Sequence, residues 1–61
     1  MEPEIGDIWL DEENEHSLVT DVWYNEDADC THVTVLCLNT GRVYSENPLD
    51  MFGDFFVEKV G

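Results

Sequence analysis

Three observations on the sequence predict an all-β fold. Segments rich in Val, Thr and aromatic residues recur along the chain, as is typical of strands. Short stretches that contain Gly, Asn, Asp or Pro separate these segments, as is typical of turns. A hydrophobic content of 43%, with 11% aromatic residues, suffices for a small folded core. Residues 1–61 are therefore expected to form a single domain.

The first predicted strand covers residues 5–10 and is entered through Gly6. Residues 11–16 are too charged to extend this strand and are predicted to form a loop. A helix over residues 7–16 is the competing interpretation, because acidic residues favour the start of a helix. No apolar face at a spacing of 3.6 residues supports that helix, so a strand followed by a loop is preferred.

Two longer strands are predicted in the middle of the chain. Residues 17–24 are rich in Val, Thr and aromatic residues, and an acidic loop over residues 25–31 follows them. Residues 32–38 predict the third strand, since three of these seven residues are β-branched. His32 is expected to be half-exposed on this strand, and Cys37 is expected to be a small core residue.

The last third of the sequence predicts two further strands. A tight turn at residues 39–41 joins the third strand to a fourth at residues 42–45. Pro48 cannot donate a hydrogen bond to a strand ladder and is expected to end the fourth strand. One turn of 3₁₀ helix near residues 48–52 and a final strand at residues 55–60 complete the predicted fold.

The charge of the chain is the main indication of function. Fifteen residues are Asp or Glu and only Arg42 and Lys59 are cationic, so the formal net charge is −13. A small domain is soluble at a net charge of magnitude ~2–8, and further charge adds self-repulsion. So large an excess predicts a strongly basic partner. A solvated surface that merely prevents aggregation is the alternative.

The acidic residues are segregated along the chain. Residues 1–29 contain eleven of them and neither of the cationic residues. The two predicted acidic loops flank the second strand, which places them roughly 25 Å apart at ~3.3 Å per residue. Such a stripe of carboxylates would match several consecutive phosphates of a DNA strand, which lie ~3.4 Å apart. The predicted partner-binding residues are Asp11, Glu12, Glu13, Glu15, Asp21, Glu26, Asp27 and Asp29, with Trp23 as an exposed apolar anchor.

Two resemblances sharpen these expectations. Gly6-Asp7-Ile8-Trp9, the turn at residues 39–41 and the segment 48–52 resemble the SH3-like barrel group that includes Tudor domains. This resemblance implies a small five-stranded antiparallel SH3-like (Tudor-like) barrel. The size and acidity of the chain also resemble small phage proteins that mimic DNA, among them inhibitors of the host nucleoid protein HU.

The resulting functional expectation is a DNA-mimic inhibitor. Its carboxylates would occupy the DNA-binding surface of a basic host protein, with bacterial HU as the best guess, in the host cytoplasm at the nucleoid. Direct binding of nucleic acid is not expected, because phosphate contacts require Lys and Arg. Anionic lipids would repel the chain, the N-terminus lacks the basic and apolar runs of a secretory signal, and no segment is apolar enough to span a bilayer.

Other binding functions remain open. A Tudor-like reader would form an aromatic cage around a methylated Lys or Arg from Trp9, Trp23, Tyr24 or Tyr44. An acidic factor that binds RNA polymerase is equally compatible with the charge. So small a core also admits pairing of two copies through an open strand edge.

Metal sites and catalysis are not expected. An EF-hand that began at Asp11 would need Gly and Glu where His16 and Val22 stand. Cys30, His32, Cys37 and His16 lack the paired spacing of a structural zinc site. If the two cysteines lie along one extended segment, they are too far apart for a disulfide. The sequence contains no phosphate loop and no nucleophile motif, so neither an enzyme nor a cofactor is predicted.

Overall fold

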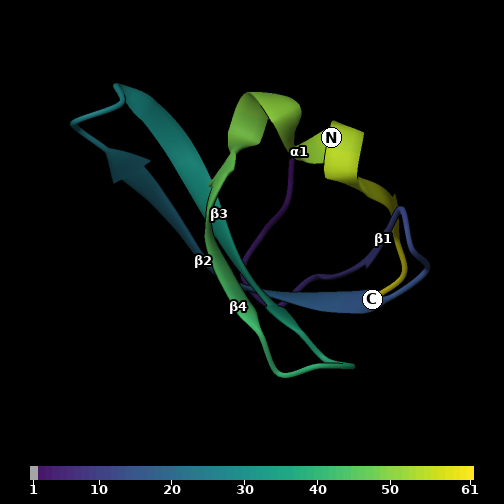
Figure 1. Cartoon of the computed structure of the whole chain (residues 1–61). Coiled ribbons are helices and arrows are strands. Elements are labelled where there is room, and N and C mark those ends of the chain that lie inside the picture. Colours follow the sequence, from purple (N-terminus) through teal and green to yellow (C-terminus); the bar gives the residue numbers. More distant parts are fainter. Residues whose placement is uncertain (1) are drawn as a thin grey trace.

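The computed structural model describes residues 2–61, whose five strands form one antiparallel sheet in the order β4-β3-β2-β1-β5 (Figure 1). The elements are β1 (Ile8–Asp11), β2 (His16–Asn25), β3 (Cys30–Cys37), β4 (Val43–Pro48), the 3₁₀ helix η1 (Leu49–Met51), the short helix α1 (Phe52–Phe55) and β5 (Phe56–Lys59). The predicted all-β fold with five antiparallel strands is confirmed. The edge strands β4 and β5 do not pair with each other, so the curled sheet stays open between them.

One face of the sheet carries the hydrophobic core. Val19, Val33 and Val35 are fully buried there, since the register of β2 against β3 places them on the same face. An aromatic cluster from β1, α1 and β5 covers these valines. The Trp9 ring meets the Phe52 ring edge-on, with centroids 5.2 Å apart, and Phe52 stacks on Phe56 at 4.4 Å.

The start of the chain differs from its prediction. Ile5 and Gly6 form a turn, and β1 begins only at Ile8, so the predicted strand start at Ile5 is wrong. Gly6 has a φ of +96°, which only glycine adopts readily, and its N–H donates to the Val19 carbonyl at 2.9 Å. The competing helix over residues 7–16 does not form, because β1 and a turn occupy that segment.

The fourth strand is longer than predicted, since β4 continues through Pro48. Pro48 lies opposite His32 at the last position of an edge strand, where a missing N–H removes no inner ladder bond. The side chain of Asn47 supports this extension by donating to the Val33 carbonyl at 2.9 Å, where the register of β3 against β4 shifts. The predicted strand end at Ser45 is therefore wrong, whereas Pro48 is the last residue of the strand, in agreement with its predicted role in ending it. The 3₁₀ turn is confirmed at Leu49–Met51, and α1 follows it directly and delays the last strand to Phe56.

The outer face of the sheet holds a second small packing site. His32 is only 5% exposed there, so the prediction of a half-exposed residue is wrong. The ring of Trp23, opposite His32 in the register, covers it with centroids 5.2 Å apart. Cys37 is buried on the inner face as predicted, and both cysteines are free. Among residues 2–61, neither helical segment has the length and apolarity needed to cross a membrane.

Replacing Phe52 with Ala should lower the free energy of unfolding by about 3–5 kcal/mol, because the ring contacts both Trp9 and Phe56 in the core. That loss equals most of the stability of a domain this small. Urea denaturation followed by circular dichroism measures it, and an F52A protein unfolded without urea also meets the expectation. F55A is the matched control, since Phe55 is 39% exposed. Equal losses in the two variants would show that Phe52 does not anchor the core.

Candidate interface for a basic partner

The turn between β1 and β2 is acidic and firmly hydrogen-bonded. The Oδ1 atom of Asp11 accepts hydrogen bonds from the backbone N–H groups of Glu13 and Glu15, each at 2.9 Å. Asn14 adopts a left-handed φ of 67° and donates its N–H to the Asp11 carbonyl at 3.0 Å. One carboxylate thus organises the turn, and the side chains of its neighbours project from a fixed backbone.

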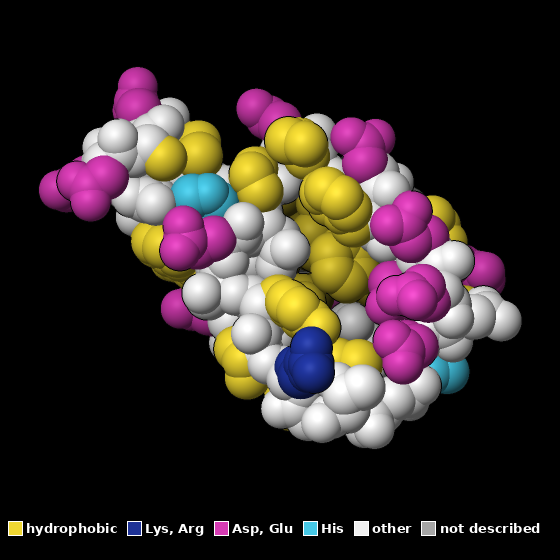
Figure 2. All heavy atoms as spheres, viewed as in Figure 1, with side chains coloured by type: hydrophobic (Ala, Val, Ile, Leu, Met, Phe, Trp, Pro, Cys, Tyr) yellow, Lys and Arg dark blue, Asp and Glu magenta, His cyan; other side chains and the backbone are white. Residues whose placement is uncertain are grey.

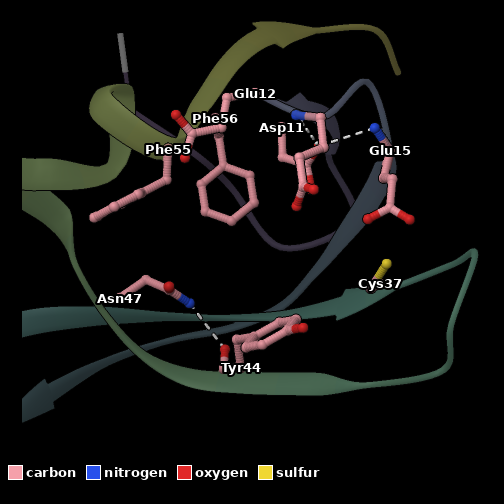
Figure 3. A pocket seen from close by; sticks show the side chains of 9 residues that line it. Asp11, Glu12, Glu15, Cys37, Tyr44, Asn47, Phe55 and Phe56 are labelled. Carbon is pink, nitrogen blue, oxygen red and sulfur yellow. Dashed lines mark hydrogen bonds between the residues drawn. The ribbon is translucent and has the colours of Figure 1, made fainter.

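A backbone hydrogen bond ties this turn to helix α1. The N–H of Glu12 donates to the Phe55 carbonyl at 3.1 Å, which brings the end of α1 beside the acidic residues. A groove of about 260 Å³ opens between this junction and β4 (Figure 3). Because β4 and β5 do not pair, the groove lies where the sheet is open. We call it the acid-rimmed groove; it is lined by Asp11, Glu12, Glu13, Glu15, Cys37, Tyr44, Asn47, Phe55 and Phe56.

The two walls of the acid-rimmed groove differ in chemistry. Asp11, Glu15 and Phe56 lie on one side, and Tyr44 and Asn47 of β4 lie on the other (Figure 3). Figure 2 shows a hollow with a hydrophobic floor and a row of acidic side chains along one edge. None of the lining residues is cationic. This site can therefore hold a group that is both positively charged and partly apolar.

The turn between β2 and β3 forms a second acidic group. Glu26, Asp27 and Asp29 are exposed there, at the tip of a hairpin that projects from the sheet (Figure 1). The side chain of Asn25 accepts the N–H of Asp27 at 3.0 Å, and the Tyr24 hydroxyl donates to the Asp29 carboxylate. The two acidic turns stand at opposite ends of the ten-residue strand β2. That strand spans about 30 Å at ~3.3 Å per residue.

Asp21 and Trp23 lie on the outer face of the sheet, two residues apart on β2. Asp21 is exposed, whereas Trp23 is half-buried against His32 and donates its indole N–H to the Thr34 hydroxyl at 3.0 Å. The structure thus brings together four of the predicted residues in the acid-rimmed groove and three at the β2–β3 turn. Asp21 and Trp23 stand apart from the groove, on the other face of the sheet.

Part of the groove was not predicted from the sequence. Asn47, Phe55 and Phe56 were not among the predicted binding residues, and Tyr44 was predicted only as a cage residue. The four aromatic candidates for a cage occupy different places. Trp9 is buried in the core, Trp23 packs on the outer face, and Tyr24 and Tyr44 line separate pockets. The adjacent pair Phe55 and Phe56, where the last strand begins, was the available signal, because only one of the two rings can point into the core.

Within residues 2–61, one set of three or more side chains has the proximity that a metal ion needs. Ligand atoms of Asp11, Glu13 and Glu15 all lie within 4.8 Å of one another. Hard cations such as Ca²⁺ or Mg²⁺ would suit these oxygens. The four residues weighed for zinc do not form such a set; of these, the Cys30 Sγ atom lies 3.7 Å from the His32 Nε2 atom.

The chain matches no family model, no curated protein and no solved structure. The candidate interface consequently rests on the geometry and charge of this chain's own residues.

Tyr24 should ionise above the ordinary tyrosine pKa of 10.0, because its hydrogen bond to the Asp29 carboxylate favours the protonated hydroxyl and raises the pKa. Ultraviolet titration of a Y44F protein, which retains only Tyr24, measures this pKa. D29N should lower it, and D27N should not. The pKa of Tyr24 is raised in the folded state, so its hydrogen bond to Asp29 contributes its full stabilisation below pH 10. That stabilisation is lost as the pH rises through the pKa of Tyr24 in the folded protein. A Tyr24 pKa at or below 10 would contradict the hydrogen bond.

Added salt should raise the thermal midpoint of unfolding by several degrees between 20 and 500 mM NaCl. Mutual repulsion among the carboxylates destabilises the compact state, and about 0.1 M salt screens charges beyond ~10 Å. Circular dichroism melting curves measure the shift. A variant with three turn acids neutralised, E13Q/E26Q/D27N, should show a smaller salt effect. A midpoint independent of salt would mean that the carboxylates do not strain the fold.

Proposed function

We propose that this protein is a DNA mimic that occludes the DNA-binding surface of a basic host protein. The observation that carries the proposal is the placement of seven acidic residues on two hydrogen-bonded turns at the two ends of β2, with Asp21 exposed between them. Figure 2 shows acidic side chains at the hairpin tip and along the far edge of the groove. The turns hold these carboxylates on a fixed backbone, which lowers the entropic cost of binding.

The dimensions agree with a short stretch of DNA. The longest dimension of the protein is 30 Å. A single DNA strand places about nine phosphates in that length, at ~3.4 Å each. The two turns supply seven carboxylates at the ends of a comparable span, and Asp21 lies between them on the outer face of the sheet. A basic surface arranged for a phosphate strand could therefore pair with a similar number of negative groups.

Competition with DNA follows from the chemistry of such a surface. Carboxylates accept hydrogen bonds from Lys and Arg, and from Arg in a bidentate manner, as phosphates do. Opposite charges speed the encounter of the two proteins, so the protein would reach the partner rapidly at low salt. The resemblance to phage inhibitors of HU supports bacterial HU as the partner and the host nucleoid as the place of action.

The strand order supports an SH3-like or Tudor-like arrangement. β1 lies between β2 and β5, and a helical turn precedes β5, as the resemblance implies. The open sheet makes this a partial barrel in our proposal. Such a fold hosts many unrelated functions, so the proposal rests on the charged surface and not on the fold.

Displacement of DNA from purified HU tests the proposal. A fluorescently labelled duplex bound to HU should be released when this protein is added at 50 mM NaCl, and release should weaken steeply by 300 mM because the contacts are ionic. Fluorescence anisotropy measures the release. The E13Q/E26Q/D27N variant should need at least about tenfold more protein, since exposed ion pairs contribute about 0.2–1 kcal/mol each and interfacial pairs more.

The matched control neutralises three exposed acids that belong to neither turn, in the variant E2Q/E4Q/E58Q. It carries the same net charge as the turn variant, and the amount of protein needed to release the DNA should rise less than about threefold. The proposal fails if the unmodified protein leaves DNA on HU at 50 mM NaCl. It also fails if both variants lose equally, because the effect would then come from net charge alone.

A further inference from the structure

We infer that the acid-rimmed groove is a receptor for one arginine side chain of the basic partner. The inference rests on the proposed function, in which the partner is basic, and adds the residue that the partner inserts. Elsewhere on the surface the carboxylates are solvated by water and can pair with any cation. The groove combines four carboxylates with two exposed aromatic rings, whereas the pocket at the β2–β3 turn has one exposed ring, that of Tyr24, whose hydroxyl already donates to Asp29.

The size of the groove favours a side chain. Its volume of about 260 Å³ is at or below the ~300–1,000 Å³ of typical small-molecule sites. It opens where the sheet is unclosed, so a segment of a partner can lie across the gap and lower one side chain into it. A long, thin side chain fits this shape better than a cofactor does.

Aromatic rings lie on both sides of the groove (Figure 3). Phe56 and Cys37 are buried at its base, whereas Tyr44 is 48% exposed and Phe55 is 39% exposed. Contact with water does not stabilise exposed aromatic rings. They can stack against a flat cation, and such cation–π contacts are worth roughly 0.5–1 kcal/mol at exposed sites.

The rim supplies unpaired negative charge. None of the four rim carboxylates forms an ion pair within the described part of the chain, where the Lys59 ammonium lies 4.0 Å from Asp7 instead. Asp11 uses one oxygen to hold the turn, which leaves the side chains of Glu12, Glu13 and Glu15 to meet a ligand. The three carboxylate groups from Asp11, Glu13 and Glu15 converge within 4.8 Å, so a cation placed among them would relieve their repulsion.

Asn47 adds a neutral acceptor to the opposite wall. Its Nδ2 atom donates to the carbonyls of Val33 and Tyr44, each at 2.9 Å. The amide is thereby fixed with its oxygen as the group left to accept a hydrogen bond. A guanidinium group has five donors in one plane, so it can bond to both walls while it stacks on a ring. A lysine ammonium is more strongly hydrated and does not stack in this way.

Titration with tripeptides tests the inference directly. The probes are Ac-Gly-Arg-Gly-NH₂, its lysine analogue and its citrulline analogue, which keeps the planar shape of arginine without the charge. Amide resonances of the ¹⁵N-labelled protein are followed in buffer with EDTA, so that no metal competes for the rim. The arginine peptide should give saturable shifts at residues 12–15, 44 and 55. The lysine peptide should bind at least threefold more weakly, and the citrulline peptide should give no saturable shift.

Two pairs of variants locate the site. Y44A should weaken the arginine peptide at least fivefold, whereas Y24A removes an equally exposed tyrosine from another pocket and should not. E13Q should weaken it, whereas E26Q, at the other turn, should not. Both tyrosines are exposed, so neither substitution should unfold the protein. A well-dispersed ¹⁵N spectrum of each variant is the check that it folds.

Several results would overturn the inference. Equal shifts from the arginine and lysine peptides at both acidic turns would indicate diffuse attraction, and tighter binding of a dimethylarginine peptide would indicate a methyl reader. The DNA displacement assay separates this inference from the proposed function. If Y44A displaces DNA from HU as well as the unmodified protein does, the groove inference fails and the DNA mimic stands. If the unmodified protein displaces none, the DNA mimic fails.

Discussion

The aromatic cluster of Trp9, Phe52 and Phe56 is the interaction on which the other features of this protein depend. It joins β1, α1 and β5, and of these three elements β1 is the one that pairs with β2 in the sheet. By fixing Phe52 and Phe56, the cluster also fixes Phe55 between them, and the Phe55 carbonyl holds the β1–β2 turn through the N–H of Glu12. The acidic rim of the groove is thus positioned by an apolar contact. In a domain of 61 residues, the same few rings must supply both stability and the shape of the groove.

The core tolerates the charge of the chain because the two are kept apart. Most carboxylates lie on turns and exposed strand positions, where water solvates them, and the inner face of the sheet is lined by valines and aromatic rings. Two polar nitrogens are also buried, one in the core and one on the outer face of the sheet. Within the described residues, the indole N–H of Trp9 and the Nδ1 atom of His32 are buried without a hydrogen-bond partner. An unsatisfied buried group costs about 1–3 kcal/mol, so a small, self-repelling domain carries these costs in addition to its charge.

The sequence predicted what depends on neighbours along the chain. The β-branched run of β3, the turn after it and the 3₁₀ turn at Leu49 follow from local preferences, and all three are seen. Features that depend on distant partners were missed. Pro48 stays in its strand because β4 lies at an edge, and His32 is buried because Trp23 of the neighbouring strand covers it. The acidic turns were predicted as separate loops, whereas the groove needs β4 to curl toward α1. No pattern in the sequence predicts that curvature of β4, so Asn47 and Phe55 could not be assigned to the groove from the sequence.

Long-range and short-range recognition would use different parts of this surface. Thirteen net negative charges act over about a Debye length, and they attract a basic surface without regard to which cation lies where. Salt weakens that attraction strongly. Contacts inside the acid-rimmed groove act at van der Waals distance, beside rings that exclude water, and salt screens them less. A partner held by net charge alone would leave at moderate salt. One that also places an arginine against Tyr44 and Phe55 would dissociate more slowly, because ring contacts and hydrogen bonds must break before it leaves. In the proposed complex, charge would set how fast the two proteins associate, and the groove would determine which basic protein stays bound.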